Sequence, residues 1–253
     1  MIGYAAAMSG KLRLGCAVFV TPLHSPVHLA KSISTLDQLS RGRLEVGVGI
    51  GGRNRMFSAF EVDPDDGLVA RFVEGLDVMK ALWTESDATV DGRFWQLHGA
   101  PMEPKPFQKP YPPLWFGGSQ PAALRRAVRL GDGFFGAGSS TTASFVEQVG
   151  VVRSYLIETG KDPKEFGIAK RVYVAVDDDP ARGRQRMSEA LIGFYGEFGQ
   201  TLLPVAVVGT AADCVAGLQQ VADAGAELIL LNPLFDLAEQ RDRLAAEVMP
   251  NVG

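Results

Sequence analysis

Apolar runs alternate with amphipathic helical patterns along almost the whole chain, and this alternation restricts the fold more than any other feature. Six runs fit strands that are covered on both faces, and they are residues 12–20, 44–50, 114–116, 133–136, 172–176 and 228–231. Helical patterns separate them at residues 27–39, 72–83, 121–130, 145–158, 180–198 and 211–224. Such repetition predicts parallel strands joined by right-handed crossovers.

The length of 253 residues suits one α/β domain of the TIM (β/α)8-barrel type. We therefore expect a single barrel domain over residues 1–253. A closed barrel of this type needs eight strands, and the patterns supply six. Two strand–helix units are therefore missing from the expected barrel.

The alternation stops between residues 84 and 113. Residues 90–94, which read Val-Asp-Gly-Arg-Phe, predict a small hairpin with an Asp-Gly turn. Six prolines hold the following stretch in extended conformation. A loop of this length inside a compact domain usually covers an active site or contacts a partner. We interpret residues 84–113 as an insertion into the barrel.

Composition narrows the possible functions. The net charge is −4 and the basic residues are scattered, so we expect no nucleic-acid partner. Cys16 and Cys214 lie far apart in sequence, which fits the reduced cytoplasm. The histidines, His24, His28 and His98, are dispersed and lack metal-ligand spacing, so no metal site is expected. No apolar run reaches the ~20 residues that span a bilayer, and we expect no membrane partner.

Ligands of parallel α/β proteins bind at the carboxyl ends of the strands. Gly117, Gly118 and Ser119 lead from one such end into a helix, whose first N–H groups suit a phosphate. The alternative is a tight turn that the glycines merely permit, with Ser119 as the helix cap.

Two other strand ends carry candidate residues. Residues 47–52 lack the spacing of a dinucleotide fingerprint, since Arg53 stands where its third glycine belongs. They predict a small-residue strand end, including Gly51, over which a flat ring could lie, or else close backbone packing. His24 follows the first strand and is a candidate general acid or base, its alternative being a solvated loop histidine.

Several motifs together resemble the luciferase-like monooxygenase superfamily. Residues 36–43 read Leu-Asp-Gln-Leu-Ser-Arg-Gly-Arg, residues 115–119 read Trp-Phe-Gly-Gly-Ser and residues 131–134 read Gly-Asp-Gly-Phe, in the family's order. The resemblance covers nearly the whole chain. It implies a TIM-type barrel that binds the deazaflavin coenzyme F-420 or FMN at the carboxyl-end mouth. We favour coenzyme F-420, because residues 21–26 read Thr-Pro-Leu-His-Ser-Pro and the Gly-Gly-Ser turn is tight, and keep FMN as the alternative.

The resemblance also implies roles for individual residues. In the deazaflavin branch a non-proline cis peptide forms a bulge behind the ring, and the matching positions are Ala17 and Val18. The family's phosphate-binding turn matches Gly117, Gly118, Ser119, Gln120 and Ala122. The turn after the next strand, which contains Gly138 and Ser139, helps to bind substrate in some members.

The first strand matches the third strand of the family, so the resemblance implies an amino-terminally truncated barrel. Either the true start lies upstream, or the chain is a shortened relative. The family's usual acidic-histidine catalytic pair belongs to the unmatched second strand, which leaves His24 as the catalytic candidate. An open barrel exposes strand edges, so we expect a second copy of the chain to cover them in a homodimer.

Three functions follow as hypotheses. The first is a flavin- or deazaflavin-dependent oxidoreductase or monooxygenase acting on a small organic substrate. The second is a flavin-binding or interaction protein without catalysis. The third is a non-redox barrel lyase, which needs a catalytic lysine or carboxylate at a strand end, and none is convincing in the sequence.

Overall fold

The computed structural model describes residues 1–52 and 56–253. The chain divides into two compact units, Met1–Gly117 and Gly118–Gly253, and each is described by itself. Arg53, at the fingerprint position, lies outside the described residues. The expectation of one domain over residues 1–253 stays a prediction.

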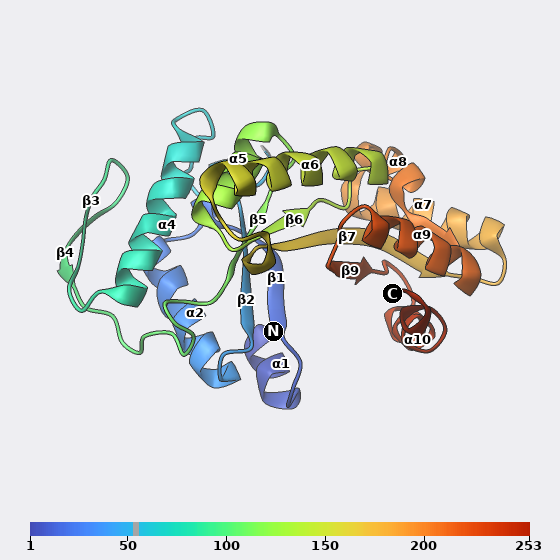
Figure 1. Ribbon diagram of the computed structural model, residues 1–253, viewed down its shortest axis with the longest axis horizontal. Helices are drawn as coiled ribbons and strands as arrows, with labels where there is room; N and C mark the ends of the chain where they lie inside the picture. Colours follow the sequence, from blue (N-terminus) through green and yellow to red (C-terminus); the bar gives the residue numbers. More distant parts are fainter. Residues whose placement is uncertain (53–55) are drawn as a thin grey trace. The chain divides into compact units, whose positions relative to one another are not determined.

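The first unit is built on three parallel strands in the order β1-β2-β5 (Figure 1). Its elements are α1 (Ile2–Met8), β1 (Leu14–Val20), the 3-10 turn η1 (Thr21–Leu23), α2 (Pro26–Ser40), β2 (Leu44–Gly49), α3 (Met56–Ala59), α4 (Leu68–Thr84), β3 (Ala88–Asp91), β4 (Gln96–Ala100) and β5 (Leu114–Gly117). The helix predicted over residues 72–83 is α4, and its apolar face is buried and consists of Phe72, Leu76, Met79 and Trp83.

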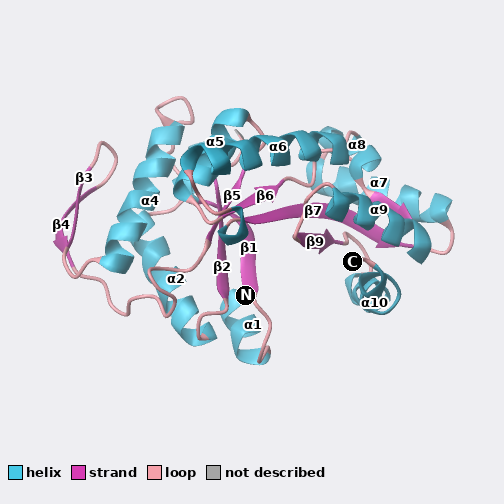
Figure 2. Ribbon diagram, in the orientation of Figure 1, coloured by secondary structure: helices cyan, strands magenta, loops and turns pink. Residues whose placement is uncertain are grey.

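The second unit surrounds the long strand β7, which pairs in parallel with β6, β8 and β9 (Figure 2). Its elements are α5 (Pro121–Leu130), β6 (Gly133–Gly136), α6 (Thr142–Thr159), η2 (Pro163–Glu165), β7 (Gly167–Val176), α7 (Pro180–Tyr195), α8 (Glu197–Gln200), η3 (Leu203–Val205), β8 (Val207–Gly209), α9 (Ala211–Asp223), β9 (Leu228–Asn232), α10 (Leu237–Arg243), the π-helical turn η4 (Leu244–Val248) and η5 (Met249–Asn251). Within the described part of the chain, no helix combines the length and apolar character needed to cross a membrane.

All six predicted strands are present, and within each unit they pair in parallel as expected. Strand β7 begins five residues earlier than predicted, at Gly167 rather than Val172. The polar pair Lys170–Arg171 interrupts the apolar pattern there and conceals the start of the strand. The short elements α1, α3, β8 and α10 were not predicted, because each is too short for a clear period.

The hairpin in the insertion exists, but the predicted Asp-Gly turn is wrong. Asp91 is the last residue of β3 and pairs with Gln96 of β4, so the loop has four residues, 92–95. Glu74 of α4 holds this loop, since its carboxylate accepts hydrogen bonds from the backbone N–H groups of all three residues 93–95, at 2.6–3.0 Å. A Cβ on Gly92 would overlap that carboxylate. The loop conformation is therefore set by a partner 19–21 residues away, not by its own two central residues.

The remainder of the insertion is attached along α2. Asp37 is fully buried and its carboxylate accepts two hydrogen bonds from Gln108, one from the backbone N–H and one from the side-chain amide, both at 2.8 Å. Gln38 donates to the carbonyl oxygen of Lys105, also at 2.8 Å. The segment after the hairpin is thus satisfied by α2 side chains, which an extended, proline-rich stretch needs because it has no ladder of its own.

Arg43 is the last residue of the motif at residues 36–43, and it holds α1 in place. Its guanidinium donates to the carbonyl oxygens of Ala6, Ser9 and Leu12 at 2.6–2.8 Å. The motif at residues 36–43, which carries much of the family resemblance, therefore contributes to the packing of the first unit.

Candidate active site

The carboxyl end of β1 contains the bulge that the family resemblance implied. The peptide between Ala17 and Val18 is cis, as predicted, and the pairing with β2 shifts between Cys16 and Phe19. The side chain of Ala17 is exposed and that of Val18 is partly buried. The bulge therefore presents a small side chain and backbone on its open face.

Glycines in the neighbouring strands give the bulge its space. A Cβ on Gly47 would overlap the carbonyl oxygen of Cys16, and a Cβ on Gly49 would lie 2.8 Å from a methyl group of Val18. Gly51 has φ 81° and is exposed, and its Cβ would lie 2.6 Å from Val20. The glycine-rich end of β2 therefore shows close packing, which was one of its two interpretations. The other, a flat ring lying over Gly51, stays a prediction.

His24 lies just beyond β1, where η1 ends. Its side chain is exposed, and its backbone N–H donates to the carbonyl oxygen of Thr21 at 3.0 Å. The imidazole packs edge-to-face against the ring of Phe19, with 6.3 Å between the ring centres. It also lines a small cavity together with Arg71 and Trp95. An imidazole that is both exposed and positioned can exchange protons with a bound molecule, so His24 stays the catalytic candidate.

The turn before α5 differs in detail from the prediction. The residue that caps α5 is Gln120, with Pro121 in the first helical position, so the alternative in which Ser119 is the cap is wrong. No side chain caps this first turn in the described structure, and both Ser119 and Gln120 are exposed. Gly118 has φ 147°, and a Cβ there would lie 2.8 Å from that of Ala123. The uncapped amides are the arrangement that an anion can complete.

The turn after β6 is held by two hydrogen bonds from Lys170, a residue that no sequence pattern indicated. Lys170, in β7, is only 3% exposed, and its ammonium donates to the carbonyl oxygens of Ala137 and Ser140 at 3.1 and 2.8 Å. Burial, assisted by the adjacent charge of Arg171, lowers the pKa of Lys170 to about 8. Lys170 faces Gly136, the end of β6, but both contacts are to backbone carbonyls, which indicates a structural role.

Of the two predicted substrate residues, Gly138 is buried and Ser139 is exposed. A Cβ on Gly138 would lie 2.8 Å from Nε of Arg171 and 3.1 Å from the ring of Tyr173. The phenol of Tyr173 accepts from Arg171 and donates to Tyr195, both at 3.0 Å. Gly138 thus packs against this polar chain, and of the two residues only Ser139 is exposed to a ligand.

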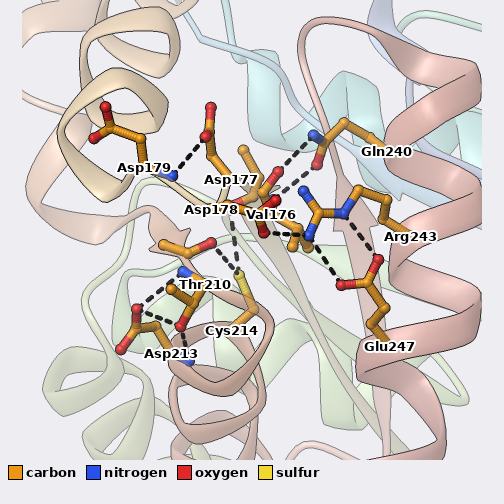
Figure 3. Close-up of polar contacts among 12 residues, drawn as sticks. Val176, Asp177, Asp178, Asp179, Thr210, Asp213, Cys214, Gln240, Arg243 and Glu247 are labelled. Carbon is orange, nitrogen blue, oxygen red and sulfur yellow. Dashed lines mark hydrogen bonds and ion pairs between the residues drawn. The ribbon is translucent and has the colours of Figure 1, made fainter.

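A polar network surrounds the carboxyl end of β7 (Figure 3). Asp177 is buried, accepts from Arg182 at 2.6 Å and from the N–H of Asp179 at 2.9 Å, and the hydrogen bond from Arg182 lowers the pKa of its carboxyl group. Arg243 of α10 donates to Asp178 and Glu247 at 2.7–2.9 Å. These charges are paired with one another, so the network anchors the helices around this strand end.

Gln240 of α10 completes that anchoring. Its amide accepts from the N–H of Val176 at 2.8 Å and donates to the C=O of Val176 at 2.9 Å. Strand β9 pairs with β7 only as far as Tyr173. Because alternate residues of a strand point their backbone groups to the same edge, and Ile168 uses its C=O on the β9 edge, Val176 faces that edge too. Gln240 therefore takes the place of a strand beyond the end of β9.

Parallel strands joined by helices place the protein in the class of α/β proteins. Within that class, the model of the luciferase-like monooxygenase family matches residues 1–203. The chain belongs to this family.

Relatives in sequence have diverse roles. A phthiodiolone/phenolphthiodiolone dimycocerosates ketoreductase of Mycobacterium sp. is 31% identical over 202 residues, 78% of this chain and 52% of the relative. An FMNH2-dependent dimethylsulfone monooxygenase of Pseudomonas putida is 29% identical over 188 residues, 73% of this chain and 50% of the relative. The chain thus spans about half the length of these relatives.

Solved structures agree on the fold. A monooxygenase of Streptomyces bottropensis matches with a TM-score of 0.86 and 26% identity, over 100% of this chain and 82% of that protein. An F420-dependent secondary alcohol dehydrogenase matches with a TM-score of 0.87 and 21% identity, over 100% and 83%. The predicted TIM-type, luciferase-like fold is confirmed.

Proposed function

We propose that the chain is a redox protein of the luciferase-like family that binds coenzyme F-420, with FMN as the alternative, and acts on a small organic substrate. The observation that carries this proposal is the bulge at the end of β1, where Ala17 is exposed beside the glycine-rich end of β2. A flat tricyclic ring requires such a surface, because a larger side chain would hold it away from the backbone. Both cofactor types occur among the similar proteins.

The bound cofactor would supply hydride transfer or oxygen activation. The residues of the chain would orient it and manage protons. Ala17 and Val18 would support the ring, Gly51 would leave room for it, and His24 would hold or deliver a proton at its imidazole. In the second unit, Ser139 is proposed to contact the substrate, next to Gly138.

Replacing Ala17 with leucine tests the proposed ring surface. We expect the mutant to bind the preferred cofactor at least tenfold more weakly, because the added methyl groups occupy the ring's place, and a loss of ~1.4 kcal/mol already amounts to tenfold. Oxidised F-420 and FMN are titrated separately, with fluorescence or absorbance as the readout. Ala212→Leu, on an exposed position of α9, is the matched control and should bind as the wild type does.

If neither cofactor binds the wild-type chain, the proposal fails. If one binds but a reduced cofactor is never reoxidised by candidate carbonyl substrates or oxygen, the alternative hypothesis of a non-catalytic flavin-binding protein is supported.

The expected homodimer and the expected cytoplasmic location stay predictions. The exposed side chains of Leu228 and Leu230 in β9 support the homodimer.

The turn Gly117–Gly118–Ser119 with Gln120 and Ala122 is proposed to bind the cofactor phosphate. Gln120→Asp provides a test in which two effects have opposite signs. An aspartate at the cap should stabilise α5 by roughly 1 kcal/mol, whereas its charge should repel a phosphate and weaken cofactor binding more than tenfold. Thermal unfolding and cofactor titration measure the two effects.

Gln120→Asn is the control, because asparagine caps a helix equally well without a charge. It should stabilise the protein and retain cofactor affinity. Equal affinity in Gln120→Asp and Gln120→Asn would show that the turn is only structural. Gly118 variants are less informative, since their positive φ and the contact with Ala123 disturb the turn whatever it binds.

A further inference from the structure

Two buried polar atoms in the first unit line the same small cavity. Oγ1 of Thr21 and Nε1 of Trp95 have no hydrogen-bond partner within the described part of the chain, and Thr21 is only 7% exposed. Leaving such a group unpaired costs about 1–3 kcal/mol. Two of them at one cavity indicate that a bound species completes their hydrogen bonds.

The size of the cavity limits that species. The cavity volume is about 10 Å³, roughly the room of one water molecule. Apolar side chains form much of the wall, including Phe72 and Met79. An organic molecule does not fit, so the occupant is a single water molecule or a small inorganic ion.

The charges around the cavity favour an anion. The guanidinium of Arg71 lies 4.9 Å from the ring centre of Trp95, and its Nε donates to the carbonyl oxygen of Pro22 at 3.4 Å. The described lining contains Arg71 and His24 but no Asp or Glu. The nearby carboxylate of Glu74 is occupied by the backbone N–H groups of the hairpin loop. The indole N–H is a donor only.

We infer that Thr21, Trp95 and Arg71 form a binding site for one monovalent inorganic anion of about halide size. The hydroxyl and the indole N–H donate to the anion, and the guanidinium balances its charge. Thr21 belongs to η1, which precedes His24, and Trp95 belongs to the hairpin loop. The anion thus joins the insertion to the loop that carries His24, and this inference does not depend on a redox function.

Bromide is the probe, because it quenches an indole that it contacts. Sodium bromide replaces sodium methanesulfonate at constant ionic strength, while tryptophan fluorescence is recorded. We expect saturable quenching in the wild type. Trp83 and Trp115 donate their indole N–H groups to Ala30 and Glu45, so Trp95→Phe should abolish the saturable component and Trp83→Phe should retain it.

Thr21→Val separates ligand binding from folding. Valine keeps the shape and removes the hydroxyl, so the mutant should be at least as stable as the wild type in bromide-free buffer. Its bromide midpoint should rise roughly tenfold or more, since a hydrogen bond to a charged group is lost. Bromide should also raise the melting temperature of the wild type but not of the mutant.

Two results would overturn the inference. Quenching that stays linear in bromide indicates collision only, and a midpoint unchanged in Thr21→Val places the anion elsewhere. Either result leaves water as the occupant. Anomalous diffraction from a bromide-soaked crystal gives an independent check, with a peak expected between Oγ1 of Thr21 and Nε1 of Trp95.

Discussion

Replacing Gln240 with alanine should lower the free energy of unfolding by about 2–5 kcal/mol. Gln240 is 3% exposed, and the mutation leaves both the N–H and the C=O of Val176 buried without a partner. Each orphaned group costs about 1–3 kcal/mol. Because Trp83, Trp95 and Trp115 all lie in the first unit, chemical unfolding should be followed by far-UV circular dichroism, which also reports the second unit.

Two further variants identify the cause. Gln240→Met fills the same space without hydrogen bonds and should be nearly as destabilising as alanine. Gln185→Ala removes an exposed glutamine of α7 that bonds only Glu189 among the described residues, and it should stay within about 0.5 kcal/mol of the wild type. A stable Gln240→Met protein would show that packing, not strand completion, is the role of this residue.

Gly47→Ala should destabilise the first unit by about 3 kcal/mol or more. The new Cβ would overlap the carbonyl oxygen of Cys16 and lie 3.0 Å from a methyl group of Val18. Relief requires β1 to move, although Cys16 is paired with Val46 in the sheet. Overpacking against side chains typically costs 1–3 kcal/mol, and here the obstacle is backbone. Tryptophan fluorescence during denaturation reports this unit directly.

Gly52→Ala is the matched control, since among the described residues, its chain neighbours aside, no heavy atom lies within 4 Å of a Cβ at that position. It should unfold at the wild-type denaturant concentration. If Gly47→Ala did the same, the bulge would be more adaptable than its packing indicates. Under the proposed function, Gly47→Ala should also lose cofactor binding at temperatures where it remains folded.

Much of the fold could be predicted from the sequence, because strands buried on both faces and amphipathic helices leave strong periodic signals. The strands β1, β2, β5, β6 and β9 were placed to within a few residues. The cis peptide between Ala17 and Val18 came from the family resemblance alone, since nothing in those two side chains specifies it.

The polar contacts could not be predicted in the same way. Gln240 meets Val176 across 64 residues, and Asp37 meets Gln108 across 71. No local pattern distinguishes such residues from solvated ones. Arg182 of the charged helix α7 likewise pairs with the buried Asp177. The residues of the proposed site, from Ala17 to Ser139, stay predictions until a ligand is bound.

The hydrogen bonds between Glu74 and the hairpin loop have a consequence for how this protein can evolve. Because the carboxylate binds main-chain N–H groups of residues 93–95, the loop keeps its position whatever side chains it carries, provided that Gly92 leaves room. Selection can therefore change the side chain at position 95, which lines the same cavity as His24, at little cost to folding. In related chains that retain the Glu74–Gly92 pair, the residue at position 95 should be the first to differ when the ligand differs.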